Sequence, residues 1–328
     1  MSAKSRVICT ALFGAILGAL SFTGCGGSAN SPWANATGPK VAVSFAPIYC
    51  FATNVAGPDA TIQSVMSNQG PHHFDPTPND ARLIAGADLF IINGLTLDNR
   101  IAEKMMRGAG NSKLKLIDLG KSFDPKSLLE MAHNHEGHDH AHHDHEHGEH
   151  DPHVWLGLDQ AELMVNAIRD ALKDADPAKA ANYDRRAAEY IAKLRKLKAD
   201  GVELFKDKKN RNFVTFHESL GYLAATFKLE VVDVIQKTPG KEPTAKELDR
   251  LIKLCTTFQS VRVIAVEPQY STQTSAKRIL DELKAKGVHD AVLVEIDPLE
   301  TANPEELTPE WYEMKMRKNL EALAQALK

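Results

Sequence analysis

Histidine dominates the chemistry available to this chain. The sequence holds 14 histidines, and ten of them fall between His133 and His153. Imidazole nitrogens suit borderline-soft cations such as Zn²⁺, and three of them with a carboxylate or a water complete its tetrahedral coordination. The pattern therefore indicates a protein that handles a metal ion.

Five histidines lie outside the densest tract or at its border: His72, His73, His153, His217 and His289. His217 directly follows an apolar run, and His72 and His73 follow a Gly-Pro turn. His153 stands where apolar residues resume after the tract. Residues at the carboxyl ends of parallel strands line the crevice where open α/β proteins bind ligands. A lone histidine in such a place is more often structural, but the neighbouring tract favours metal ligation here.

Two acidic residues, Glu267 and Asp297, end other apolar runs. Either one could supply a fourth ligand, or could hold a histidine in its metal-binding tautomer from behind. Acids at strand ends also serve as N-caps of the following helix. We favour the cap for Glu267, and both alternatives stay open for Asp297.

Apolar runs that alternate with amphipathic segments must position these side chains. Short runs rich in Val, Ile and Leu indicate strands that are covered on both faces. They span 40–46, 61–65, 88–92 and 115–119 in the first half, and 212–216, 230–235, 262–266 and 291–296 in the second. Helical patterns separate them, at 78–87, 248–258 and 275–286 among others. The alternation predicts an α/β fold of two similar lobes, each a four-stranded, parallel-rich sheet flanked by helices.

One long, rigid helix is expected to join the two lobes. Asp176-Pro177 is typical of an N-cap followed by proline at the first helical position, and the apolar spacing continues to about Lys206. About thirty residues make a rod of roughly 45 Å, which is long enough to bridge two lobes and to restrict hinge motion. A last helix, capped at Thr308-Pro309, should run to the C-terminus.

The N-terminus predicts export. Lys4 and Arg6 precede an uncharged apolar stretch over 7–22, which is shorter than the roughly 20 residues needed to span a bilayer. An export signal over 1–24 is therefore favoured over a permanent anchor helix. Cys25 follows a small residue where a lipoprotein signal places its lipidated cysteine, although Phe22 is unusual there. We expect a protein at the periplasmic or extracytoplasmic face of the cell membrane, lipid-anchored at Cys25.

Four segments follow the signal. They are a flexible tether over 25–39, an N-terminal metal-binding lobe over 40–158, a helical region with the linking helix over 159–210, and a C-terminal metal-binding lobe over 211–328. Cys50 and Cys255 fall in different lobes, and two unpaired buried thiols are favoured over a disulfide between them.

The His-rich tract over 131–151 is predicted to be a mobile loop, because it has almost no apolar side chain to bury. Pairs of its imidazoles could chelate metal, with lower affinity than a preformed site because each binding event must order the loop. The auxiliary ligands would be His133, His135, His138, His140, His142, His143, His145, His147 and His150. We expect the loop to gather zinc or buffer an excess of it.

Five motifs in this order resemble those of the zinc-uptake solute-binding proteins of ABC importers, the ZnuA and adhesin-like group. They read PHHFDPTPND at 71–80, DPHVW at 151–155, FHESLGY at 216–222, EPQY at 267–270 and DPL at 297–299. The resemblance covers the whole exported chain. It selects His72 over His73 and implies a cleft site of His72, His153, His217 and Asp297. Asp75 and Glu300 depart from the pattern, which usually has glutamate and glycine there, and Glu300 leaves the turn near Asp297 uncertain.

The resemblance also implies capture of Zn²⁺ as a transported ligand and its delivery to a membrane permease. Zinc is implied over manganese, because manganese members usually replace the third histidine with a carboxylate, a harder ligand. The alternative is a periplasmic zinc buffer or metallochaperone that acts mainly through the His-rich loop. We expect a monomer.

Other classes of function are disfavoured. Gly221 breaks the HExxH pattern of zinc proteases at His217-Glu218, and the paired cysteines of zinc deaminases are missing. We therefore expect no enzymatic activity. A formal net charge of −4 offers no basic footprint for nucleic acid.

Overall fold

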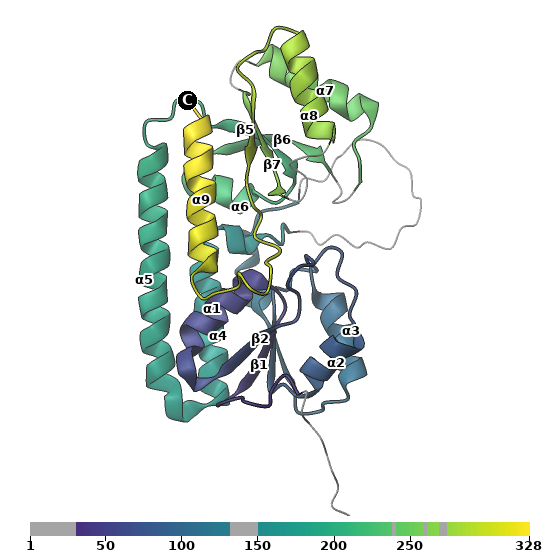
Figure 1. Cartoon of the computed structure of the whole chain (residues 1–328). Helices are drawn as coiled ribbons and strands as arrows, with labels where there is room; N and C mark the ends of the chain where they lie inside the picture. The colour runs from purple at the N-terminus through teal and green to yellow at the C-terminus, as the bar shows by residue number, and fades with distance from the viewer. Residues whose placement is uncertain (1–30, 132–149, 238–240, 259–260, 269–273) are drawn as a thin grey trace, which may run out of the picture.

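The computed structural model describes residues 31–131, 150–237, 241–258, 261–268 and 274–328. They form two lobes, each built on a four-stranded sheet (Figure 1). The first sheet has the order β2-β1-β3-β4 and the second β6-β5-β7-β8, and every neighbouring pair is parallel. The strands are β1 (Lys40–Val43), β2 (Thr61–Ser64), β3 (Leu89–Ile92), β4 (Lys115–Asp118), β5 (Asn212–His217), β6 (Glu230–Gln236), β7 (Val263–Val266) and β8 (Val292–Glu295). The predicted fold class is confirmed.

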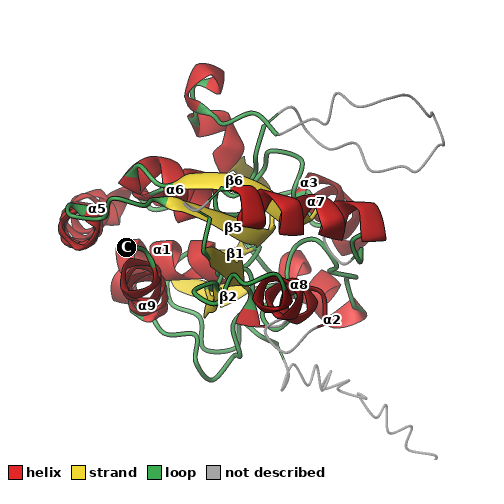
Figure 2. Cartoon of the chain, turned by 90° about the horizontal axis from the view of Figure 1, so that it is seen from above, coloured by secondary structure: helices red, strands yellow, loops and turns green. Residues whose placement is uncertain are grey.

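Helices cover both faces of these sheets, which is why the central strands are continuously apolar. All four residues of β3 and all four of β7 are buried. The helices are α1 (Ala46–Ala56), α2 (Pro78–Ala85), α3 (Asn99–Ala109), α4 (Leu158–Ala175), α5 (Ala180–Phe205), α6 (Gly221–Phe227), α7 (Ala245–Thr257), α8 (Thr274–Ala285) and α9 (Trp311–Ala326). In Figure 2, α5 and α9 lie on one side of β5 and β6, and α7 and α8 lie on the other.

Helix α5 runs alongside both lobes, with α9 beside it (Figure 1). Its 26 residues give a length of about 39 Å. One stripe of the helix, which includes Tyr183, Leu194 and Phe205, is buried. It packs against α1 and α4 at one end and against α6 at the other. The predicted linking helix therefore exists and contacts both lobes.

One helix start was predicted wrongly and another only in part. Asp176 and Pro177 take the predicted N-cap and first helical positions, but Asp176 forms no side-chain cap bond, and the first turn, Pro177–Lys179, is 3-10 helix before α5 begins at Ala180. Helix α9 begins at Trp311 rather than at Thr308-Pro309, because the carbonyl of Thr308 accepts the Trp311 N–H in a preceding turn. In both places proline favours a turn but does not mark the first residue of the α-helix.

One apolar core is shared by the N-terminal lobe, α5, α9 and one face of the second sheet, and a smaller core lies beneath α7 and α8. Cys50 and Cys255 are free and buried in these two cores respectively, which confirms the prediction of unpaired thiols. Across the described ranges, every helix is too short or too polar to span a bilayer. The export signal and Cys25 lie outside the described residues.

Candidate metal centre

Three histidines and one glutamate from distant parts of the chain meet between the lobes. His72 lies in the loop between β2 and α2, and His153 precedes the short turn Val154–Leu156 at the start of α4. His217 is the last residue of β5, and Glu300 follows β8. One ligand atom from each of the four lies within 4.8 Å of all the others. The cluster therefore has the donor set of a metal site.

Four of the six separations among these donor atoms match those around a tetrahedral zinc ion, and all six lie within 4.8 Å. Oε1 of Glu300 lies 3.4 Å from Nε2 of each of the three histidines. Nε2 of His72 and Nε2 of His153 are 3.3 Å apart. Around Zn²⁺ with ligand distances of about 2.0–2.1 Å, tetrahedral neighbours lie about 3.3–3.4 Å apart. Octahedral Mg²⁺ at the same distances would bring them to about 2.9 Å.

Two buried polar atoms of the cluster face each other at 3.4 Å without a hydrogen bond to any described residue. Nε2 of His217 and Oε1 of Glu300 are buried and form no hydrogen bond to any described residue. An unpaired buried carboxylate oxygen is costly, and so is an unpaired buried imidazole nitrogen. A cation between them would satisfy both, so the cluster is arranged for an ion.

Two carboxylates hold the histidines from behind. Oδ1 of Asp151 lies 2.7 Å from Nδ1 of His153 and also accepts the His153 backbone N–H. Oε1 of Glu267 pairs in the same way with Nδ1 of His217. A proton kept on Nδ1 leaves Nε2 free to bind a metal. Glu267 therefore supports His217, and the helix cap favoured from the sequence stays a prediction, because residues 269–273 lie outside the described part of the chain.

These carboxylates also set the proton affinity of the site. Burial opposes protonation of His153, but Asp151 and Glu300 outweigh it and raise the pKa of His153 to about 8. Burial is likewise outweighed at His217, where Glu267 and Glu300 raise the pKa to about 10. Within the described ranges no carboxylate pairs with Nδ1 of His72, and burial lowers the pKa of His72. Burial opposes ionisation of Glu300, yet the three imidazoles hold its pKa well below the usual value.

The fold places the supporting groups where the strand order reverses. β5 and β7 are neighbours, so His217 at the end of β5 and Glu267 just after β7 meet at the carboxyl edge of the sheet. In the first lobe, Asn93 follows β3, and its Nδ2 donates to the carbonyl of Pro152. That bond holds the segment that carries His153.

Asp297, the predicted fourth ligand, is not brought to the histidines. Its Oδ1 accepts the backbone N–H of Leu299 at 2.9 Å, and its Oδ2 lies 3.4 Å from Nζ of Lys315. Glu300 takes the place that was predicted for Asp297. A signal was present in the sequence, because a carboxylate stands at position 300 where the resembling family usually has glycine.

The other predicted histidines fall outside the cluster. His73 and His289 are exposed. A cavity of about 380 Å³ reaches the cluster past His73, Asn68 and Gln236. His72 is the most exposed ligand, with 22% of its side chain accessible, against 3% for His153 and 5% for His217. The open side of the site is therefore the side of His72.

The His-rich loop lies largely outside the described residues. This holds for the predicted auxiliary ligands from His133 to His147. His150 is described and forms an antiparallel bridge with Glu130. His150 is therefore directly followed by Asp151, the carboxylate that holds His153.

Comparison with known proteins places the whole fold in a family. The sequence model described as "Zinc-uptake complex component A periplasmic" (ZnuA) matches residues 41–326. The high-affinity zinc uptake system protein ZnuA of Bacillus subtilis is 31% identical over 309 residues, with 92% of each chain covered. The zinc-binding protein AdcA of Streptococcus pyogenes is 31% identical over 305 residues, and the match covers 87% of this chain but 55% of AdcA.

A solved structure agrees with these sequence relatives. The Zn(II)-bound AdcA of Streptococcus pneumoniae superposes with a TM-score of 0.68 at 26% identity, covering 88% of this chain and 58% of that one. The chain thus spans about half the length of the AdcA proteins it matches. Because the family match extends over nearly all of the described fold, this chain belongs to the family of the periplasmic zinc-uptake component ZnuA.

Proposed function

We propose that this chain is the extracytoplasmic zinc-binding component of an ABC-type importer. In this role it captures Zn²⁺ between its lobes and delivers the ion to a membrane permease. The proposed ligands are His72, His153, His217 and Glu300. The observation that carries the proposal is that four of the six separations among these donors are 3.3–3.4 Å, which suits a tetrahedral ion.

The origin of the four ligands supports transport rather than permanent storage. His72 and His153 belong to the first lobe, and His217 and Glu300 reach the site from the second. An ion held by both lobes is released when the lobes or their ligand segments shift, which a partner at the membrane can drive by binding. The printed names of the relatives, zinc uptake and zinc binding, point to the same cargo.

The location and the anchor follow from the same proposal. The family description is periplasmic, and one relative of Streptococcus pneumoniae is named a zinc-binding lipoprotein. We propose that Cys25 carries the lipid, that residues 1–24 are removed, and that the exported protein works as a monomer. Mass spectrometry of the protein extracted from membranes tests the first two points.

A zinc titration against a competing chelator tests the site. The protein carries serine in place of every loop histidine from His133 to His147, so that only the cluster can bind tightly. One tight equivalent is expected, and it should disappear in the triple variant His72→Ala/His153→Ala/His217→Ala. The matched control is His73→Ala/His289→Ala, which removes two exposed histidines outside the cluster and should bind zinc as before.

The same titration distinguishes an importer component from a zinc buffer or metallochaperone. Tight binding that is lost on removal of the loop histidines would move the chemistry into the loop and favour a metallochaperone. Tight binding that survives in the triple variant would contradict the proposed ligands. With the loop histidines restored, only additional weak equivalents are expected.

A further inference from the structure

The segment that carries Glu300 has an unusual backbone. Leu299 adopts φ 60°, in the left-handed region that residues with a Cβ rarely occupy. Its side chain is completely buried. A bulky residue held in this conformation requires surroundings that determine it, and such residues concentrate at functional sites.

Three groups hold the turn from the side of the second lobe. Oδ1 of Asp297 accepts the backbone N–H of Leu299 at 2.9 Å. Asn319, a buried residue of α9, bonds both backbone groups of Asp297: its Oδ1 accepts the N–H at 2.9 Å and its Nδ2 donates to the carbonyl at 2.7 Å. Lys315, also on α9, lies 3.4 Å from the other carboxylate oxygen. Asp297 is thus fixed to α9 and in turn fixes Leu299.

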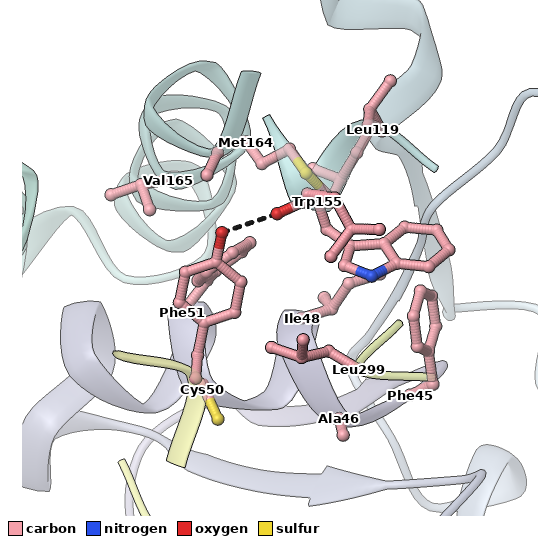
Figure 3. Packing of buried hydrophobic residues seen from close by; sticks show 14 of the residues in the cluster. Phe45, Ala46, Ile48, Cys50, Phe51, Leu119, Trp155, Met164, Val165 and Leu299 are labelled. Atoms are coloured by element: carbon pink, nitrogen blue, oxygen red, sulfur yellow. Dashed lines mark hydrogen bonds between the residues drawn. The ribbon is translucent and has the colours of Figure 1, made fainter. Parts of the chain in front are cut away.

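The first lobe holds the same segment from the opposite side. Nε1 of Trp155 donates to the carbonyl of Pro298 at 2.8 Å. Figure 3 shows Leu299 beside Ile48 and Phe45 in the core of that lobe. Farther along, the N–H of Ala302 donates to the carbonyl of Ser67 at 2.9 Å. Glu300 therefore sits between two anchored points, and its direction depends on the turn at Leu299.

We propose that Asp297 is a positioning residue, which with Asn319 fixes the left-handed turn at Leu299 and so aims the carboxylate of Glu300 at the three histidines. The inference rests on the proposed function, because it takes Glu300 as a zinc ligand. Without an acceptor for its N–H, Leu299 would relax toward negative φ and turn Glu300 away from the cluster. Asparagine at position 297 keeps an oxygen that can accept the same bond.

A double-mutant cycle tests the inference. Zinc dissociation constants are measured by chelator competition for the protein without loop histidines and for D297A, D297N, E300A and D297A/E300A. D297A should raise the dissociation constant about tenfold to a hundredfold, as supporting groups around metal ligands do. D297N should stay within about threefold of the parent. The double variant should bind no more weakly than E300A, because Asp297 acts only through Glu300.

The absorption spectrum of bound Co²⁺ supplies a second readout. The parent and D297N should share one tetrahedral spectrum, while D297A should resemble E300A, in which a protein ligand is missing. Asn319→Ala disturbs the turn from α9 and should change the spectrum as D297A does. Thermal unfolding of each metal-free variant identifies any that fail to fold, and then Asn319→Ala and D297N carry the test.

Three outcomes would overturn the inference. Equal weakening by D297A in the parent and in the E300A background, without rescue by D297N, would show that Asp297 binds the ion itself. An unchanged affinity and spectrum in D297A would reduce Asp297 to a structural role. Absence of a tight zinc site in the parent would overturn the proposed function, and this inference with it, a result distinct from the other two.

Discussion

Zinc binding at this site should release about two protons near neutral pH. With a pKa of about 8 at His153 and about 10 at His217, both imidazoles are cationic at pH 7 in the metal-free protein. His72, whose pKa is lowered, is neutral. Zinc needs the lone pair on each Nε2, so it displaces one proton from His153 and one from His217.

The apparent affinity for zinc must then fall as the pH falls. A raised pKa in the free protein means that a proton competes with the metal at every pH below that value. When the pH falls from 7.5 to 6.5, competition by protons weakens zinc binding about tenfold at His217 and about eightfold at His153. The dissociation constant for zinc should therefore rise about eightyfold. Above about pH 8 only His217 still competes, and the dependence becomes shallower.

Calorimetry in two buffers that differ in ionisation enthalpy counts the protons released at pH 7. Chelator competition at pH 6.5 and 7.5 measures the change in affinity. Glu267→Gln removes the charge behind His217 and should reduce the release by about one proton. The exposed Glu295→Gln should leave it unchanged. Release of fewer than one proton by the parent protein, or a change in dissociation constant below about tenfold, would refute the reasoning.

Further perturbations at glycines, at Trp155 and at the metal site have defined outcomes. Gly201→Ala should destabilise the protein by about 1 kcal/mol, because the new Cβ would lie 2.4 Å from a ring carbon of the buried Phe227 and overpacking outweighs the gain in helix propensity. Gly108→Ala, in α3 with nothing within 4 Å, should instead stabilise by about 0.5–1 kcal/mol, and urea unfolding compares the two. Trp155→Phe leaves the Pro298 carbonyl without its donor and should lower the free energy of unfolding by about 1–3 kcal/mol. The same variant should also lose zinc to a chelator faster, which stopped-flow mixing would measure. Zinc at a thousandfold excess over its dissociation constant should stabilise the protein by about 4 kcal/mol, which differential scanning calorimetry would detect as a higher Tm, and His72→Ala should abolish that gain.

Most of the eight strands could be predicted because they are short apolar runs between polar turns, whereas the edge strand β2 has one apolar residue and is only half-buried. Strands buried on both faces, such as β3 and β7, carry this signal without ambiguity. Helix starts were less predictable, since proline at 177 and 309 suits a turn of 3-10 helix as well as an α-helix. Residues Pro177–Lys179 are already helical, as a turn of 3-10 helix, and tertiary packing decides where the α-helix α5 begins.

The site could be predicted as far as the residues stand at strand ends or in recognisable motifs. His72, His153 and His217 come together as expected. Glu300 was missed as a ligand although its carboxylate is visible in the sequence, because its direction depends on a left-handed residue at Leu299, which local propensity disfavours. Asp297 has the position of a ligand along the sequence, but an Asx-type turn uses its carboxylate for the backbone instead.

The positions of the four proposed ligands also determine how the bound ion would cross-link the chain. His72 and His153 are 81 residues apart in sequence, and His217 and Glu300 lie farther along. An ion held by all four would close three large loops at once, as disulfides do. Closing such loops removes conformational freedom from the unfolded chain. Loaded and empty protein would then differ in their resistance to unfolding and, because proteases cut unfolded chains, in their lifetime. The bound ion would thereby prolong the life of the protein that carries it.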